Sequence, residues 1–398
     1  MNIVNAKRNI NDMVLLMDDR MTSFMNRLHP IVMWIIIIIA FVFIVVWFPS
    51  FLMIRGAAYV ERHGKNNFRQ DKINIFKFDS SATIFGNASF IIGIQMGNVM
   101  KSYGFKPKKL NSSQRVKIAD SYNEQIKIYE KFYPEILEEL RGIAYVLNMN
   151  FKNLACELIC FNGKTSGCSI FSVDGMIGRN YDWNVDAVDF IDVFTIDGKI
   201  LGISDGYLIN NYKRSDSYIM GADYINVHGL YVGITYAYSK SQNYGLNYSH
   251  YIRKIAETCK NVADVIELIK TLPLCEAKNI FVMDKDGKAI VIEHNSGLEY
   301  VIQETDLVKT NFFIDKTFAK KYDEAFNKWS KESVMSSYNK IHSLIDENKP
   351  KNLHDIKTIL DADGVYADKK TVYQLTIDAK NVLLYHKNIE YNLKQYLK

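Results

Sequence analysis

The chain has 398 residues, of which 48% are hydrophobic and 23% charged, and its formal net charge is +5. This composition is globular, and the length suits one large domain or two smaller ones. Because 44 acidic residues offset the 49 basic ones, the charge gives no support to a nucleic-acid partner, and we predict none.

The first predicted element is a membrane anchor. Residues 31–48 read "IVMWIIIIIAFVFIVVWF" and carry no charge, and an apolar run of this length matches the thickness of a bilayer. A cleaved signal peptide has a shorter leader, so the sequence predicts a polar leader over 1–29 and a retained single span over 30–54, with a buried core helix as the alternative. Basic residues flank both sides, but most of the chain follows the span, so we predict an extracytoplasmic catalytic domain.

Residues 66–163 have a partly helical pattern. The segment "IIGIQMGNVMKSYG" has apolar residues at helical spacing, and "EQIKIYEKFYPEILEELRGIAYVL" repeats them every three or four positions. Pro134 lies inside the second segment, where it fits the first turn of a new helix better than a helix interior. We therefore expect at least two helices there.

After Gly167 the pattern changes to hairpins. The segments "CSIFSVDGMIGRNYDW" and "DVFTIDGKILGIS" each place Asp-Gly between two stretches of alternating apolar and polar residues, which predicts hairpins. The segment "NIFVMDKDGKAIVIEH" has the same Asp-Gly pattern, and "TVYQLTIDAKNVLLYHK" predicts two more strands. Two helical stretches lie between them, "YIRKIAETCKNVADVIELIKTL" and "MSSYNKIHSLIDEN". Many antiparallel strands with grouped helices predict a layered α+β domain with helix-covered sheets.

The cysteines give no metal site. The chain has five cysteines, so at least one thiol is unpaired. Cys156 and Cys160 lie four apart in an apolar, helix-like stretch without a second ligand pair at zinc-like spacing, which favours core packing. We predict no metal and no cofactor.

Cys168 stands in a different setting, in "TSGCSIFSVDGMIGRNYDWN". A catalytic thiol needs a base, and none of the eight histidines has the context of a known cysteine protease. If the chain is cut before Cys168, the freed α-amino group, with an ordinary pKa of about 7.7–8.0, is a base on the same residue. The thiol itself would make the cut at the carbonyl of Gly167, a residue whose backbone tolerates strained conformations.

These motifs resemble a known family. From about residue 80 to 390 the chain resembles the autoproteolytic cysteine N-terminal-nucleophile (Ntn) hydrolases, the group of penicillin acyl-CoA acyltransferase (peptidase C45), to which choloylglycine hydrolases and acid-ceramidase-like amidases are related. The matching segments, in order, are "FIIGIQMGNVMKSYG", "YPEILEELRGIAYVLNMNFKNL", "GCSIFSV…GRNYDWN", "NVHGLYVGITYAYSK", "CEAKNIFVMDKDGKAIVIE" and "VKTNFF". The resemblance implies a four-layer αββα sandwich, a propeptide or α-chain part over 66–167 and a catalytic β-chain part over 168–398.

The resemblance also implies site residues. Cys168 is the nucleophile, freed by cleavage of the bond from Gly167; Arg179 faces the thiolate; and Asp182 holds the α-ammonium. The remaining positions carried over from the family are two for the oxyanion, Asn279 and Thr235, and three candidates for substrate binding, Asn180, Tyr236 and Asn311. Asn180 and Asn311 fit structural roles equally well.

The expected function is cleavage or acyl transfer at a linear amide bond of a small or acylated molecule, and the motifs leave open which acceptor resolves the thioester. The propeptide is expected to stay associated after cleavage. Two departures from the family are Phe312, where relatives often have His, and the absence of arginine in "SVMSSYNKI". The alternative is a non-catalytic, membrane-tethered binding protein with the same fold, which predicts an uncut chain.

Overall fold

The computed structural model describes residues 68–70, 73–82, 87–102, 104–105, 112–159, 168–182, 191–204, 221–237, 239, 243–305, 307–322, 331–367 and 370–397. All of them belong to one compact unit, Val60–Lys398. The predicted leader over 1–29, the predicted anchor over 30–54 and Gly167 lie outside the described residues. Within the described ranges, no helix is long and apolar enough to cross a bilayer.

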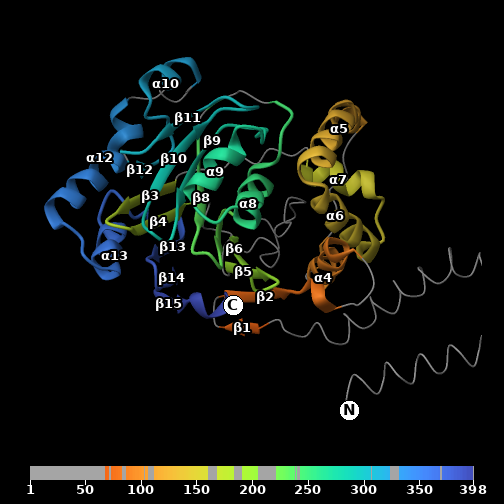
Figure 1. Ribbon diagram of the computed structural model, residues 1–398, viewed down its shortest axis with the longest axis horizontal. Helices are drawn as coiled ribbons and strands as arrows, with labels where there is room; N and C mark the ends of the chain where they lie inside the picture. Colours follow the sequence, from red (N-terminus) through yellow and green to blue (C-terminus); the bar gives the residue numbers. More distant parts are fainter. Residues whose placement is uncertain are drawn as a thin grey trace, which may run out of the picture. The chain divides into compact units, whose positions relative to one another are not determined.

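Across the described residues the strands form two sheets (Figure 1). The large sheet has nine strands, in the order β1 (Phe68–Gln70), β2 (Ile73–Phe78), β5 (Ile191–Ile196), β6 (Ile200–Ser204), β7 (Asp223–Asn226), β8 (Tyr231–Tyr236), β9 (Lys278–Met283), β10 (Ala289–His294) and β11 (Tyr300–Gln303). The small sheet has six, in the order β12 (Val308–Lys309), β3 (Cys168–Val173), β4 (Met176–Asp182), β13 (Thr371–Ile377), β14 (Val382–His386) and β15 (Ile389–Asn392).

The predicted hairpins are confirmed. The β3–β4 turn has Asp174 and Gly175 at φ of 50° and 73°, and the β5–β6 turn has Asp197 and Gly198 at 54° and 66°. Positive φ at both central residues matches the right-handed twist of the flanking strands, which is why Asp-Gly is a reliable hairpin signal. The β9–β10 and β13–β14 hairpins also form where the sequence predicts them.

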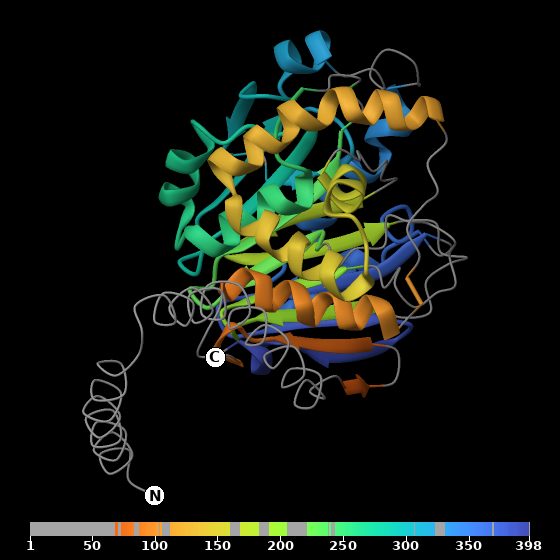
Figure 2. The same ribbon diagram turned by 90° about the vertical axis from the view of Figure 1, so that its right-hand side faces the viewer.

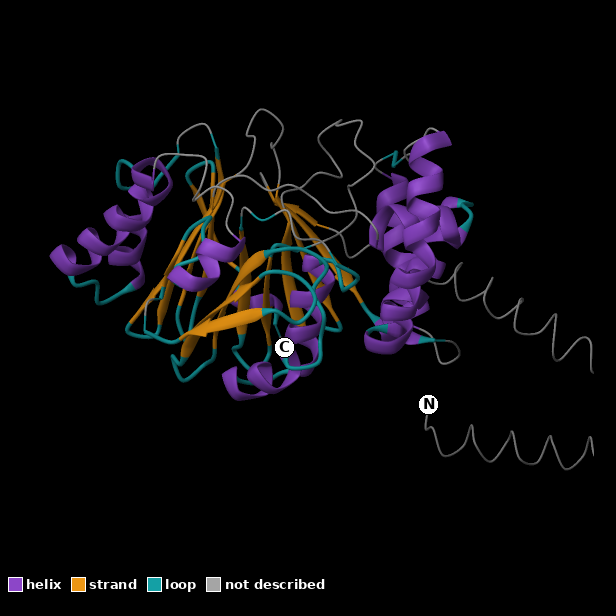
Figure 3. Cartoon of the chain, turned by 90° about the horizontal axis from the view of Figure 1, so that it is seen from above, coloured by secondary structure: helices purple, strands orange, loops and turns teal. Residues whose placement is uncertain are grey.

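The described helices and short 3₁₀ turns lie around the sheets (Figure 3). They are η2 (Ser80–Ala82), α4 (Ala88–Ser102), α5 (Ser112–Phe132), α6 (Pro134–Leu147), α7 (Phe151–Ile159), α8 (Tyr248–Thr258), α9 (Val262–Ile269), α10 (Lys316–Tyr322), α12 (Lys331–Asn348), α13 (Leu353–Asp361) and η4 (Lys394–Tyr396). α12 and α13 cover the small sheet through a cluster that includes Phe171, Ile341 and Ile356. α8 contacts the large sheet at β7 and β8, so the order of layers is helix, sheet, sheet, helix.

Helix boundaries agree with the sequence in one place and differ in another. Pro134 opens α6, as predicted. The stretch from 251 to 272, predicted as one helical segment, is two helices. The side chain of Asn261 accepts a hydrogen bond from Asp264 N (3.0 Å) and so caps the start of α9. Such a cap stabilises a new helix start and separates it from α8.

The described residues before Cys168, 68–159 with gaps, which we call the N-terminal segment, contribute the strands β1 and β2 to the large sheet. Its strand β2 pairs in parallel with β5, from Ile73 opposite Ile191 to Phe78 opposite Ile196. The predicted antiparallel character of the sheets holds for the other strand pairs of the described residues, and β2–β5 is the exception. A parallel pair needs a long connection between its strands, and the helices of the N-terminal segment lie within that connection.

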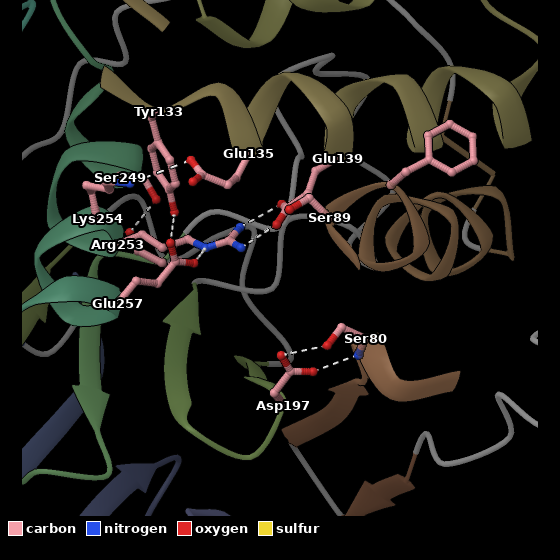
Figure 4. Close-up of polar contacts among 12 residues, drawn as sticks. Ser80, Ser89, Tyr133, Glu135, Glu139, Asp197, Ser249, Arg253, Lys254 and Glu257 are labelled. Carbon is pink, nitrogen blue, oxygen red and sulfur yellow. Dashed lines mark hydrogen bonds and ion pairs between the residues drawn. The ribbon is translucent and has the colours of Figure 1, made fainter. Parts of the chain in front are cut away.

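Helices α5 and α6 of the N-terminal segment pack on α8 (Figure 2). Arg253 on α8 binds both carboxylate oxygens of Glu139 at 2.8 and 2.5 Å, and its Nε binds Glu257 at 2.8 Å. Tyr133 OH donates to Glu257. Figure 4 shows Arg253 between the two carboxylates. The contact buries Glu139 of the N-terminal segment and Arg253 of the part that follows Cys168, so each charged side chain is paired by one from the other part of the chain.

Candidate active site

Cys168 is the first residue of β3 and is buried. Its backbone N donates to Asn311 Oδ1 at 2.8 Å, and its Sγ lies 3.9 Å from the backbone O of Asp182. Burial raises the pKa of the Cys168 thiol to about 11, while the charge of Arg179 opposes the rise. In the intact chain the thiol is therefore neutral at physiological pH, and it needs a base before it can act as a nucleophile.

Arg179 shares a face of the small sheet with Cys168. In the antiparallel register Cys168 lies opposite Tyr181 and Ile170 opposite Arg179, so these side chains point toward the large sheet. The guanidinium is fully buried and lies 5.3 Å from the centre of the Tyr181 ring. Its two Nη atoms have no hydrogen-bond partner among the described residues. A buried guanidinium with unused donors is suited to hold an anion or a polarised carbonyl oxygen.

Asp223, a residue that the sequence analysis missed, fixes this guanidinium. Arg179 Nε donates to Asp223 at 3.0 Å. Two tyrosine hydroxyls donate to the same carboxylate, Tyr231 at 2.6 Å and Tyr373 at 2.5 Å. Three donors therefore anchor Asp223 between the two sheets, and Asp223 in turn fixes the guanidinium through its Nε, while the two Nη atoms stay without a partner among the described residues.

The only sequence signal for this arrangement is a glycine. Gly233, inside the segment "NVHGLYVGITYAYSK", lies opposite Asp223 in the β7–β8 pair. A Cβ at position 233 would clash with both the Asp223 carboxylate and the Tyr231 hydroxyl. The motif glycine thus makes room for the group that holds Arg179, but its presence in a sequence does not reveal which carboxylate lies beside it.

Asp182 ends β4, opposite Thr371. Thr371 Oγ1 donates to its carboxylate at 2.7 Å. Burial raises the pKa of Asp182 to about 6, and the hydrogen bond from Thr371 and the charge of Arg179 act in the opposite direction. The predicted role of Asp182, to hold the α-ammonium of Cys168, stays a prediction, because in the intact chain the Cys168 nitrogen binds Asn311 instead.

Asn311 is the side-chain amide that contacts Cys168. Besides accepting from Cys168 N, it donates through Nδ2 to the backbone O of Tyr236 at 3.1 Å. The ring of Tyr236 instead lies 5.0 Å from Lys278 Nζ. Tyr236 and Lys278 are neighbours on the face of the large sheet opposite to Thr235. These contacts favour a structural contribution from the Tyr236 backbone.

Asn279 and Thr235 are neighbours on β9 and β8. Asn279 Nδ2 lies within hydrogen-bond distance of Thr235 Oγ1 (3.1 Å), Thr310 O (3.2 Å) and Phe312 O (3.4 Å). Thr235 Oγ1 donates to Thr310 O at 2.5 Å. Both side chains therefore bind the backbone next to Asn311, and donation to an oxyanion by Asn279 stays a prediction. Its Oδ1 has no partner in the described part of the chain.

Asn180 lies on the other face of the small sheet. Its Nδ2 donates to Leu360 O and Val365 O, each at 3.1 Å, and its Oδ1 accepts from Gln374 Nε2 at 3.0 Å. These bonds tie β4 to the residues at and after the end of α13. The contacts favour the structural role that the sequence left open for Asn180.

Together these contacts define what the site can do. A thiol, a buried guanidinium with two unused nitrogens and the side chain of Asn311 gather where β3 and β4 of the small sheet face β7 and β8, two inner strands of the large sheet. Among the described residues, no group of histidine, cysteine or acidic side chains is placed to hold a metal ion. The arrangement is suited to nucleophilic attack on a carbonyl carbon.

Comparison with known proteins agrees with this class of site. The model of one family, described as acyl-coenzyme A:6-aminopenicillanic acid acyl-transferase, matches residues 171–386. No curated protein has a sequence that matches the chain.

Similar solved structures include penicillin V acylase from Agrobacterium tumefaciens, at 12% identity and a TM-score of 0.41, covering 58% of this chain and 87% of that one. A variant of the conjugated bile acid hydrolase from Clostridium perfringens is 14% identical, with a TM-score of 0.41 and coverage of 57% and 92%. The N-acylethanolamine-hydrolyzing acid amidase orthologue from Caenorhabditis elegans is 14% identical, with a TM-score of 0.37 and coverage of 54% and 93%.

The fold and the site define an enzyme of the amide hydrolase or acyltransferase class. The matched family model covers more than half of the chain, and the chain belongs to the acyl-coenzyme A:6-aminopenicillanic acid acyl-transferase family. This membership confirms the resemblance to the cysteine Ntn hydrolases and the enzyme class that it implied.

Proposed function

We propose that this protein is a self-processing cysteine amidohydrolase or acyltransferase that acts on a linear carbon–nitrogen bond, with Cys168 as the N-terminal nucleophile. The observation that carries the proposal is the setting of Cys168. It begins a strand, its nitrogen is held by Asn311, and it lies on the same face as the buried Arg179, whose Nη atoms are unused. A cysteine that only filled the core would need none of these neighbours.

Maturation is the first step. The thiol of Cys168 attacks the carbonyl carbon of Gly167, and the bond from that carbon to the Cys168 nitrogen breaks, which leaves a thioester and a free amine. Water then attacks the thioester, so Gly167 leaves as a carboxylate and the thiol is restored. The product has a nucleophile and a base on one residue, with the amine close to its operating pH.

Turnover uses the same atoms. The α-amine takes the thiol proton, and the thiolate forms a bond to the amide carbon of the substrate. We assign to Arg179 the task of holding the thiolate or the developing oxyanion by charge. The α-ammonium gives its proton to the leaving nitrogen as the carbon–nitrogen bond breaks. Water or an acceptor amine then attacks the thioester, and the choice of acceptor decides between hydrolysis and acyl transfer.

We further propose that the N-terminal segment stays bound after the cut. Support comes from the β2–β5 pairing and from the buried contact of Arg253 with Glu139, which cleavage near residue 167 leaves intact. With the predicted span over 30–54, this segment would then hold the catalytic segment at a membrane without a covalent link, on its extracytoplasmic side. Membrane sedimentation of the cleaved protein, followed by mass analysis of both fragments, tests this part separately.

The central experiment is intact mass measurement and N-terminal sequencing of the purified protein beside a Cys168→Ala variant. We expect the wild-type protein to contain a fragment that begins at Cys168 and the variant to remain whole. A whole chain in both preparations would contradict self-processing and favour the non-catalytic binding protein. The cleaved protein is then incubated with penicillin V, a conjugated bile acid and an N-acylethanolamine, with and without 6-aminopenicillanic acid as acceptor.

A further inference from the structure

Three neighbouring strands of the large sheet place a row of polar side chains toward the small sheet. Thr235 on β8 lies opposite Asn279 on β9, and Asn279 lies opposite Glu293 on β10. Residues that are opposite each other in antiparallel strands point to the same face. All three side chains are buried. The row is thus continuous across three strands.

Each member of the row binds the segment 309–315, which begins at the last residue of β12, at the edge of the small sheet. Thr235 and Asn279 bind the backbone oxygen of Thr310, and Asn279 also reaches that of Phe312. Glu293 accepts the backbone N–H groups of Ile314 and Asp315, the second at 3.0 Å. The row therefore holds the backbone of this segment near both of its ends.

Glu293 makes a further contact that the other two do not. It forms an ion pair with Lys309, and both side chains are almost wholly buried. Lys309 lies on β12 opposite Ile170 of β3. The ion pair therefore joins the large sheet to the small sheet beside β3, two residues along that strand from Cys168. Replacing a buried ion pair by apolar residues is often neutral or stabilising. Stability alone is therefore a weak reason to keep this pair.

What lies between the anchored ends is Asn311. Its side chain connects Cys168 N to Tyr236 O, so any shift of the segment changes the position of the amide relative to Cys168. Charge-assisted hydrogen bonds are stronger than neutral ones and hold geometry more tightly. The carboxylate of Glu293 accepts three such hydrogen bonds, which Lys309 Nζ and the backbone N–H groups of Ile314 and Asp315 donate.

We propose that Glu293, through Lys309 and the two backbone N–H groups, is a positioning residue that sets Asn311 against Cys168. The proposal rests on the proposed function of Cys168, because the expected consequence is slower maturation and turnover at that residue. It assigns Thr235 and Asn279 to the same task. Glu293 itself touches no reacting atom.

The test uses the full chain and three variants: Glu293→Gln, Glu293→Gln with Lys309→Met, and the control Glu276→Gln. The control removes the carboxylate charge of another buried ion pair, Lys278–Glu276 at 3.1 Å. Among the described residues, Glu276 makes no hydrogen bond to the segment 309–315. Hydrogen exchange of peptides over 307–315 reports how tightly the backbone of the segment is held. Cleavage before Cys168 and alkylation of its thiol by iodoacetamide report the consequence.

In Glu293→Gln we expect exchange over 307–315 and alkylation of Cys168 to become faster by roughly tenfold, and cleavage to become slower by roughly tenfold to a hundredfold. The double variant leaves no unpaired lysine in the core, so its melting temperature should recover. Its cleavage should stay slow, because the carboxylate that holds the two N–H groups is still missing. Glu276→Gln should change none of the three rates.

Two results would overturn the proposal. The first is unchanged exchange over 307–315 in Glu293→Gln, which would mean that Glu293 does not hold the segment. The second is recovery of cleavage together with melting temperature in the double variant, which would mean a purely structural role. If wild-type protein is never cleaved, the proposed function fails, while exchange and alkylation still decide whether Glu293 positions the segment around Cys168.

Discussion

The buried carboxyl of Asp192 leads to a prediction on stability and pH. Asp192 lies on β5 opposite Asn74 of β2, at the junction between the N-terminal segment and the rest of the sheet, and accepts Asn74 Nδ2 at 2.9 Å. Burial raises the pKa of Asp192 from 3.8 to about 7, and the bond from Asn74 lowers it only in part. Between pH 3.8 and about 7, Asp192 therefore binds its proton more tightly in the folded state than in the unfolded state.

The sign follows from this difference. Because the folded pKa is raised, the contribution of Asp192 to stability is complete below about pH 4 and is lost as pH rises through about 7. The difference between 3.8 and about 7 corresponds to about 4 kcal/mol of unfolding free energy. Asp192→Asn cannot ionise but keeps an acceptor for Asn74. Its stability relative to wild type should thus rise by about 4 kcal/mol between about pH 4 and about pH 8.

The assay is urea denaturation of the purified full chain across that range, with wild type and variant side by side so that all other titrating groups cancel. Asn74→Ala is the matched control. It removes the hydrogen bond that lowers the pKa of Asp192, so we expect its pH dependence to be steeper than that of wild type. A difference between Asp192→Asn and wild type that stays constant with pH would refute the reasoning.

Three further variants test the buried charges and a hydrogen bond to one of them. Glu139→Gln leaves Arg253 with Glu257 as its remaining carboxylate, so we expect a loss of about 3 kcal/mol in unfolding free energy. We also expect the N-terminal segment to separate from the cleaved protein on size-exclusion chromatography. If the two fragments of the variant stay associated, Glu139 does not hold them together. Asp223→Asn leaves Arg179 buried without its charged partner and should cost about 3–5 kcal/mol, with slower cleavage before Cys168. Tyr373→Phe, which removes one hydrogen bond to the same carboxylate, should cost only about 1 kcal/mol, and an equal loss in both variants would count against Asp223 as the holder of Arg179.

Local patterns predicted the hairpins and the helix start at Pro134 because those features depend on a few adjacent residues. Asp-Gly at positions 174–175 takes positive φ at little cost, and proline at a helix start loses no hydrogen bond. The break at Asn261 was missed, although a capping asparagine is visible in the sequence, because the apolar spacing continues across it. The strand β2 was missed for a different reason: it becomes a strand by pairing with β5, far along the chain.

The candidate site shows the same division. The motif around Cys168 predicted that Cys168 and Arg179 belong to one site, and the β3–β4 register places both on one face of the small sheet; their joint action stays a prediction. Asp223, Lys309 and Glu293 carry no such signal. Each becomes part of the site only when the two sheets come together, because its partner lies on another strand or on the other sheet.

The sequence by itself determined the family, the hairpins and the placement of Cys168 and Arg179 on one hairpin, since all of these depend on residues close together in the chain. Tertiary structure decided which amide contacts Cys168, which carboxylate holds Arg179, and how the N-terminal segment joins the large sheet. The physical reason is that buried polar and charged groups must find partners when water is removed. Those partners are chosen by the packing of strands and helices and not by their distance along the chain.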